Sequence, residues 1–382
     1  MFLKPDSLTE LSCGQFEEFI ISMGEPGYRA GQLRKWVYEK LAFSLAEMTD
    51  LPLAFRERLA QETKLHSLER IQQSTGKDGT VKSLFALADG NTVEAALMYY
   101  GGEDGGERRT VCVSTQAGCS IGCPFCATGQ QGYQRNLTSG EIIDQALYFA
   151  GFLRDNSRES GDPAGKTGGR VSNIVFMGMG EPLANYDALW QAVETLNAPE
   201  CFKLGARNMV ISTAGLVPQI KRLSKEKLQV GLAVSLHASD NKLRDRLVPV
   251  NRKYPLEDLI QACREYSLVK GRRLSFEYIL FNGLNDSPEQ ARTLAMLIRG
   301  IKCHVNLIPA NLTSEKAFQP PPYHRVLAFE ETLKQCHVNV TLRERRGQDI
   351  DAGCGQLRSR YLKETGRERK KDSRWEKANH VS

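Results

Sequence analysis

From Thr110 onward the chain alternates six times between a short apolar run and a longer amphipathic stretch. The apolar runs are VCVST, VSNIVFMG, NMVIST, VGLAVSLH, RLSFEYIL and HVNLIP. The amphipathic stretches that follow them cover residues 139–152, 186–196, 217–223, 256–266, 288–298 and 326–335. Strands that are apolar throughout are typical of a parallel sheet buried on both faces, and repeated strand–helix units build such a sheet. We therefore predict an α/β fold, a barrel or partial barrel of six strand–helix units.

The first 95 residues follow a different pattern. Three amphipathic helical patterns and then two short alternating runs stand there, beginning at Phe16, Gln32, Leu53, Val81 and Thr92. We predict an accessory domain of helices and a small sheet over residues 1–95, a catalytic core over 96–357 and a basic C-terminal tail over 358–382. The Gly- and Ser-rich residues 156–170 are predicted to be an exposed loop.

The formal net charge is +6, from 51 basic and 45 acidic residues, and most of the excess lies near the C-terminus. Residues 358–377 contain nine Lys or Arg and four Asp or Glu. Such a segment suits a phosphate backbone, and it is equally typical of a solvated charged end. No apolar run approaches the roughly 18 residues of a membrane span, and the first residues lack a signal-peptide pattern. We expect a cytoplasmic protein without a membrane segment.

Three of the ten cysteines, Cys119, Cys123 and Cys126, stand in a C-x3-C-x2-C pattern. Zinc and fully protein-ligated iron–sulfur clusters normally take four protein ligands. Three thiolates on a 4Fe-4S cluster leave one iron for a small chelator, such as the amino and carboxylate groups of S-adenosylmethionine (SAM), and the pattern resembles the radical SAM superfamily. The alternatives are a zinc knuckle with its fourth ligand elsewhere, or three unrelated buried thiols.

Five other cysteines lie within or beside apolar segments, and we assign them to packing. They are Cys13, Cys201, Cys263, Cys303 and Cys336.

Polar residues stand where several of the predicted strands end, the place where chemistry gathers in barrels of this kind. The second strand runs into GMGEP, a turn in which Glu181 offers a carboxylate to a ligand amine. The other strand ends supply Ser212, Thr213, Ser235, Leu236, His237, Asn306 and then Asn311. Each alone is more typical of an ordinary turn or a helix cap. Together with the cysteine loop they are predicted to ring one edge of one sheet.

The chain resembles the bacterial dual-specificity RNA methyltransferases, which methylate carbon 2 of adenosine. The resemblance reaches to about residue 357 and rests on VCVSTQAGCSIGCPFCATG, MGMGEP, SLH and GQDIDAGCGQL. It implies a partial (βα)6 radical SAM barrel with a small N-terminal helical domain that contacts RNA and is likened to helix-hairpin-helix modules. The implied partners are 23S rRNA, tRNA and a low-potential electron donor such as flavodoxin, and we expect a monomer.

The resemblance also implies a set of site residues. A 4Fe-4S cluster is expected on Cys119, Cys123 and Cys126. SAM contacts are expected at Gly180, Glu181, Ser212, Ser235, Leu236, His237 and Asn311.

Three further residues receive chemical roles from the resemblance. Cys354 takes a methyl group from one SAM, and radical cleavage of a second SAM removes hydrogen from that methyl group, which then adds to the base. Glu94 removes the proton from carbon 2, and Cys112 attacks the sulfur of Cys354, so that a disulfide forms and the RNA is released. From the residues alone, a buried strand cysteine and an inert loop cysteine are favoured instead. Candidate cations that would lower the pKa of both thiols are Arg343, Arg345 and Arg346.

Two other functions stay open on the sequence. The first keeps the mechanism but methylates carbon 8, as related resistance enzymes do. Pro182 favours carbon 2, because carbon 8 relatives often carry alanine at that position. The second is an RNA-binding protein whose cluster or zinc ion is only structural, and it differs from both enzymes in releasing no 5'-deoxyadenosine.

Overall fold

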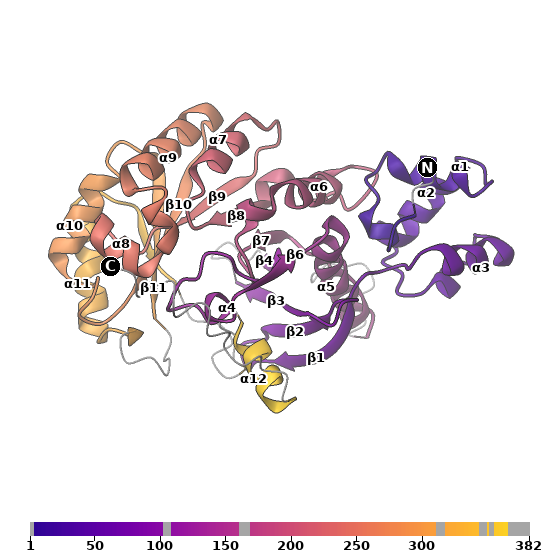
Figure 1. The fold of residues 1–382 in the computed structure, drawn as a ribbon, viewed down its shortest axis with the longest axis horizontal. Coiled ribbons are helices and arrows are strands. Elements are labelled where there is room, and N and C mark those ends of the chain that lie inside the picture. Colours follow the sequence, from indigo (N-terminus) through magenta and orange to yellow (C-terminus); the bar gives the residue numbers. More distant parts are fainter. Residues whose placement is uncertain are drawn as a thin grey trace, which may run out of the picture.

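The computed structural model describes residues 4–101, 108–159, 169–310, 318–343, 350 and 355–365. Figure 1 shows a small helical unit at the N-terminal end, next to a larger body in which helices pack against a twisted sheet. The predicted α/β architecture with an N-terminal helical unit is confirmed.

Ten strands form one open sheet in the order β1-β2-β3-β4-β7-β8-β9-β10-β11-β12. The pairs from β1 to β4 are antiparallel, and every pair from β4 to β12 is parallel. The strands are β1 Glu69–Thr75, β2 Val81–Ala86, β3 Thr92–Tyr100, β4 Arg108–Cys112, β7 Asn173–Phe176, β8 Met209–Thr213, β9 Gly231–Ser235, β10 Leu274–Leu280, β11 Cys303–Pro309 and β12 Val340–Leu342. β1 and β12 are the two edge strands, so the sheet does not close into a complete barrel.

Six long helices follow the six parallel strands β4 to β11, which confirms the predicted count of strand–helix units. They are α5 Ser139–Glu159, α6 Tyr186–Asn197, α7 Val217–Lys225, α9 Leu256–Lys270, α10 Pro288–Leu297 and α11 Tyr323–Gln335. Local signals set their ends: Ser287 and Gln290 form a capping box at the start of α10. The shorter pieces are α4 Ala127–Gln130, α8 Asn241–Leu247, α12 Gln356–Glu364, η4 Pro182–Asn185, η5 Ala206–Asn208 and η6 Pro249–Arg252.

The N-terminal unit consists of short helices around a core that includes Phe16, Leu33 and Phe55. Its elements are η1 Leu8–Glu10, α1 Gln15–Ser22, α2 Arg29–Arg34, η2 Lys35–Glu39, η3 Leu45–Glu47 and α3 Leu53–Glu62. The three predicted helical patterns are confirmed, although the second is divided into α2 and the π-helical turn η2. In the part of the chain that the structure describes, no helix is long and apolar enough to cross a membrane.

The structure revises two of the predicted boundaries. The division between residues 95 and 96 falls inside β3, and β1 to β3 continue the barrel sheet. The tail predicted from residue 358 does not begin there, because α12 packs on the sheet and the Arg358 side chain is buried. In the predicted loop 156–170, α5 extends to Glu159, and residues 160–168 lie outside the described residues.

The assignment of five cysteines to packing is only partly confirmed. Cys263 is fully buried and Cys303 packs against the core. Cys336, in contrast, is exposed. Cys13 of the N-terminal unit forms a disulfide with Cys201, which follows α6. The apolar flanks therefore predicted the burial of Cys263 and Cys303 but did not predict the disulfide between Cys13 and Cys201.

A half-buried ion pair joins the N-terminal unit to α5. One ring nitrogen of His66 lies 2.8 Å from a carboxylate oxygen of Asp144, and the other lies 2.9 Å from the carbonyl oxygen of Ala42. Both partners are acceptors, so the doubly protonated imidazolium satisfies both contacts. Burial lowers the pKa of His66, but the Asp144 charge and these hydrogen bonds outweigh it, and the net pKa is raised above 6.5.

We predict that the contribution of His66 to stability depends on pH. Because the pKa is raised on folding, the contribution is complete below the ordinary pKa of 6.5 and is lost as pH rises through the raised value. The substitution His66→Gln should lower the free energy of unfolding by about 1.5–3 kcal/mol at pH 6. Denaturant titrations of both proteins from pH 6 to 9 should show this difference shrinking. A difference that stays constant with pH would contradict the assigned ion pair.

Candidate active site

The sheet register sets which side chains face the inside of the partial barrel. In β8, Met209, Ile211 and Thr213 are buried, whereas the alternate residue Ser212 lies on the opposite face. Paired residues of neighbouring strands share a face, and Ser235 of β9 pairs with Glu277 of β10, which pairs with Asn306 of β11. Three polar side chains on adjacent strands therefore form one row inside the barrel.

The three cysteines of the C-x3-C-x2-C pattern lie on the loop between β5 Gln116–Gly118 and α4, after the first parallel strand. The amide of Cys126 donates to the carbonyl of Cys123 (3.1 Å), and the amide of Cys119 donates to the carbonyl of Gly132 (3.2 Å). The loop packs through Ile121, Cys123 and Phe125 on a small apolar cluster built around Phe281. The backbone thus holds the three thiols on one compact turn.

The electrostatics of this loop fit a metal cluster. Burial raises the pKa of Cys119 to about 12, and burial together with the charges of Cys126 and Cys119 raises that of Cys123 well above its usual value. Such thiols ionise when a bound metal compensates their charge. Among the described residues no three Cys, His, Asp or Glu side chains converge on one ion. A cubane needs no such convergence, because each thiolate binds a different iron.

The turn GMGEP brings Glu181 close to the ends of β7 and β8. The Glu181 carboxylate accepts hydrogen bonds from the amides of Leu183 (3.1 Å) and Ala214 (2.7 Å). Burial raises its pKa to about 7, although these hydrogen bonds lower it. A ligand ammonium group would stabilise the carboxylate form here, because an opposite charge favours ionisation.

Gly180 makes this turn possible. Its φ is +103°, and a Cβ at this position would lie 2.6 Å from the Cβ of Gln116. The amide of Glu181 then donates to the side-chain oxygen of Gln116 (2.9 Å). The backbone at position 180 therefore favours glycine over every residue with a Cβ.

The end of β9 lies against the cysteine loop. The rings of His237 and Phe125 meet edge to face with centroids 5.4 Å apart. Burial, with the charge of Arg244, lowers the pKa of His237 to about 3, so the imidazole is neutral. Its Nδ1 accepts a hydrogen bond from the amide of Ile279 (3.2 Å), which leaves Nε2 as the donor. Leu236 is fully buried.

Arg244 of α8 connects two strand ends through hydrogen bonds, a role that the sequence did not predict. Its fully buried guanidinium donates to the carbonyls of Ala214 (2.6 Å), Ser235 (3.0 Å) and Leu236 (3.1 Å), which joins the ends of β8 and β9. Burial lowers its pKa to about 10, so it remains a cation, and its charge lowers the pKa of the Cys123 thiol. An arginine in the polar stretch NKLRDRL has the pattern of a solvent-facing residue.

Cys112 is the last residue of β4 and lies near the charged side chains of Arg343, Lys82 and Glu94. Burial raises the pKa of Cys112 to about 11, and the Arg343 guanidinium, its second influence, lowers it. The expected cation, Arg343, is thus present and lowers the pKa of this thiol, but burial has the larger effect. Arg343 also lies 3.9 Å from Glu277, whose other carboxylate oxygen accepts from Asn306 (2.8 Å).

Glu94 of β3 is buried and engages the start of α12. Its carboxylate oxygens accept hydrogen bonds from the amides of Gly355 (2.7 Å) and Arg358 (2.5 Å) and pair with Lys82 (2.8 Å). Four predicted residues, Asn311, Arg345, Arg346 and Cys354, lie outside the described residues. Gly355 is the residue that directly follows Cys354 in the chain.

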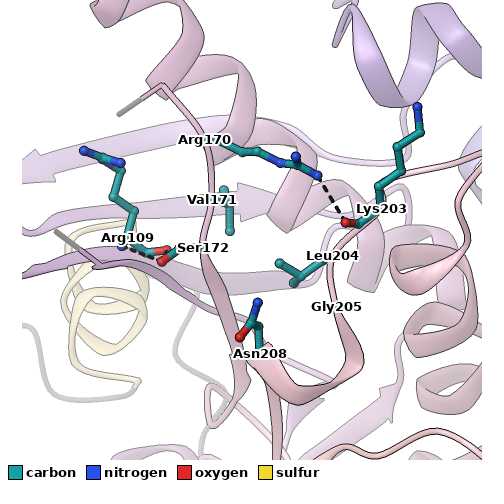
Figure 2. Close-up of a pocket in the computed structure, with 8 residues that line it drawn as sticks. All are labelled: Arg109, Arg170, Val171, Ser172, Lys203, Leu204, Gly205 and Asn208. Atoms are coloured by element: carbon teal, nitrogen blue, oxygen red, sulfur yellow. Dashed lines mark hydrogen bonds between the residues drawn. The ribbon is translucent and has the colours of Figure 1, made fainter. Parts of the chain in front are cut away.

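A pocket of about 380 Å³ opens where β4, β7 and β8 begin, at the opposite ends of the strands from Glu181 and His237. Figure 2 shows its lining, Arg109, Arg170, Val171, Ser172, Lys203, Leu204, Gly205 and Asn208. Arg170 donates to the carbonyl of Lys203 (3.1 Å), and the Lys203 ammonium is paired with Glu39. The basic side chains do not converge on one point (Figure 2), so this pocket is no part of the candidate active site.

A partial barrel of six strand–helix units, with three cysteines in the loop after its first parallel strand, has the organisation of a radical SAM enzyme. Two family models match the chain accordingly: "Radical SAM superfamily" over residues 162–295, and "Ribosomal RNA large subunit methyltransferase N-terminal domain" over residues 7–65.

Similar proteins narrow the class further. The chain is 48% identical over 361 residues to "Probable dual-specificity RNA methyltransferase RlmN" of Chloroflexus aurantiacus, covering 93% of both proteins. It is 42% identical over 363 residues to the protein of the same name from Geobacillus kaustophilus, covering 94% of both. A radical SAM methyltransferase structure from Sphaerobacter thermophilus superposes with a TM-score of 0.86 at 45% identity, covering 93% of this chain and 100% of that one. The chain belongs to the RlmN family of dual-specificity radical SAM RNA methyltransferases.

We predict that Gly180→Ala abolishes SAM cleavage. The new Cβ would collide with Gln116 and strain the backbone, which moves Glu181 and costs at least about 1–3 kcal/mol of stability. The matched control is Gly90→Ala, where φ is +81° but no atom lies within 4 Å of the new Cβ. Release of 5'-deoxyadenosine and thermal unfolding measure both effects. Parent-like cleavage by Gly180→Ala would show that this turn does not position the ligand.

Proposed function

We propose that this enzyme methylates carbon 2 of adenosine in 23S rRNA and in tRNA, using two SAM molecules for each methyl group. The identity of 42–48% to relatives named dual-specificity RNA methyltransferases, over more than nine-tenths of the chain, supports this most directly. Cys354 is the proposed methyl carrier, Glu94 the base and Cys112 the thiol that releases the product. A low-potential donor such as flavodoxin is the proposed electron source.

The contacts around Glu94 support these three roles. Ala96 pairs with Cys112 across β3 and β4, and Glu94 stands two residues from Ala96 on the same face. The Glu94 carboxylate also binds Gly355, the neighbour of Cys354 in the chain. The proposed base therefore lies close to one proposed thiol and is hydrogen-bonded to the segment that carries the other.

SAM and the cluster have suitable surroundings at the ends of the parallel strands. We propose Cys119, Cys123 and Cys126 as cluster ligands, and the bound cluster would supply the electron for SAM cleavage. Glu181 is the proposed acceptor for the SAM amine. Further proposed SAM contacts are Gly180, Ser212, Ser235, Leu236, His237 and Asn311. The Arg244 guanidinium joins the ends of β8 and β9, and the His237 side chain joins the end of β9 to β10, which supports these contacts.

We predict that the reconstituted enzyme converts adenosine in both RNAs to 2-methyladenosine and releases 5'-deoxyadenosine. Mass spectrometry of digested RNA checks the position of the methyl group, and 8-methyladenosine as the product would contradict the proposal. The variants Cys119→Ala, Cys123→Ala and Cys126→Ala are the controls. Each should lose the cluster iron and the nucleoside, because three ligands leave none to spare.

We predict that Cys112→Ala traps the RNA on the protein. Cys112 acts only at release, so the carbon–carbon bond should form while the RNA stays joined to Cys354. Denaturing gels should show an RNase-sensitive band that disappears when Cys354 is also replaced. Cys336→Ala, which removes an exposed thiol, is the matched control and should show no band. A band that persists without Cys354 would overturn the assigned roles.

A further inference from the structure

Lys82 and Glu94 form an ion pair that is almost fully buried between β2 and β3. The Lys82 Nζ lies 2.8 Å from Glu94 Oε2, and the two residues are 2% and 3% exposed. A buried pair of this kind is costly to desolvate and is tolerated when further hydrogen bonds satisfy its polar atoms. Glu94 obtains those hydrogen bonds from a distant part of the chain.

The partners of Glu94 are backbone amides at the beginning of α12. Gly355 N–H donates to Oε2 (2.7 Å), and Arg358 N–H donates to Oε1 (2.5 Å). The first amides of a helix have no partner within the helix, and an anion near them is favourable. Glu94 therefore caps α12 as an N-cap side chain would, although it lies 261 residues before Gly355.

The same end of α12 contacts the helix that follows the cluster loop. The Gln131 side chain, next to α4, donates a hydrogen bond to the carbonyl of Gly355 (3.1 Å). The Arg358 side chain donates a hydrogen bond to the hydroxyl of Thr92 in β3 (3.0 Å). Gly355 has φ +79°, and a Cβ there would lie 2.6 Å from the hydroxyl oxygen of Thr128 in α4. The helix start is thus held between β3 and α4, and Figure 1 shows α12 beside both.

The carboxylate has few acceptor sites left in this arrangement. A carboxylate offers about four lone-pair sites, and three of them face Lys82, Gly355 and Arg358. We propose that Lys82 is a positioning residue: it fixes the Glu94 carboxylate, which docks the start of α12 and so places the segment just after Cys354 beside α4. The consequence for methylation rests on the proposed role of Cys354, whereas the docking rests on these contacts.

Hydrogen exchange of the cluster-reconstituted, full-length protein tests the docking directly. Lys82→Met should speed exchange of the amides in residues 355–364 about tenfold, the factor expected for loss of a helix cap, while amides of β2 and β3 keep their protection. Methylation of RNA should fall, while the cluster iron content stays at the parent level. Lys82→Arg, which keeps the charge, should restore part of both.

Lys334→Met is the matched control, because Lys334 pairs with Glu330 on the exposed face of α11. It should leave exchange in α12 unchanged. If Lys82→Met does not fold, Lys82→Gln, which removes the charge but keeps an N–H donor for Glu94, is measured in its place, and its α12 exchange decides the question. Parent-like exchange of residues 355–364 in a folded variant overturns the proposal. A parent enzyme that methylates no RNA would instead overturn the proposed function and leave the exchange result valid.

Discussion

The parallel register from β4 to β12 decides which side chains meet inside the partial barrel. Side chains alternate between the two faces of a strand, so a slip of one residue in β10 would replace Glu277 with Phe276 or Tyr278. The helices on the outer face oppose such a slip, because they bury Phe276 and Tyr278 completely. Packing on one face of the sheet thus maintains the polar row on the other.

Three cations accompany the thiols in this interior: Lys82 and Arg244 are buried, and Arg343 is half-buried. Lys82 and Arg343 both lower the pKa of Cys112, and Arg244 lowers that of Cys123. Arg244 is bound by carbonyl and amide oxygens, so its charge is solvated by dipoles and remains available to its surroundings. Burial nevertheless dominates at both cysteines. The thiols therefore ionise less readily than exposed ones unless a ligand or metal supplies further positive charge.

The sequence predicted the six strand–helix units because strands buried on both faces have apolar runs that polar segments interrupt. It did not predict β1, whose sequence ERIQQST is polar and mostly exposed, or β12, which has three residues. The polar helix α8 was also missed, and with it Arg244. Motifs located the cysteine loop, Glu181 and His237, because each of them lies within its own short sequence pattern. The Glu94–Gly355 contact could not be read from any local pattern.

The long separation between Glu94 and its helix partner has a consequence for synthesis. Domains begin to fold from the N-terminal side while the chain is still being made. β3 can pair with β2 early, but the amides of Gly355 and Arg358 reach Glu94 only after translation has passed residue 358. Lys82, twelve residues before Glu94 and on the neighbouring strand, can neutralise the carboxylate throughout this interval. The contact between Glu94 and the start of α12 is therefore completed late in synthesis.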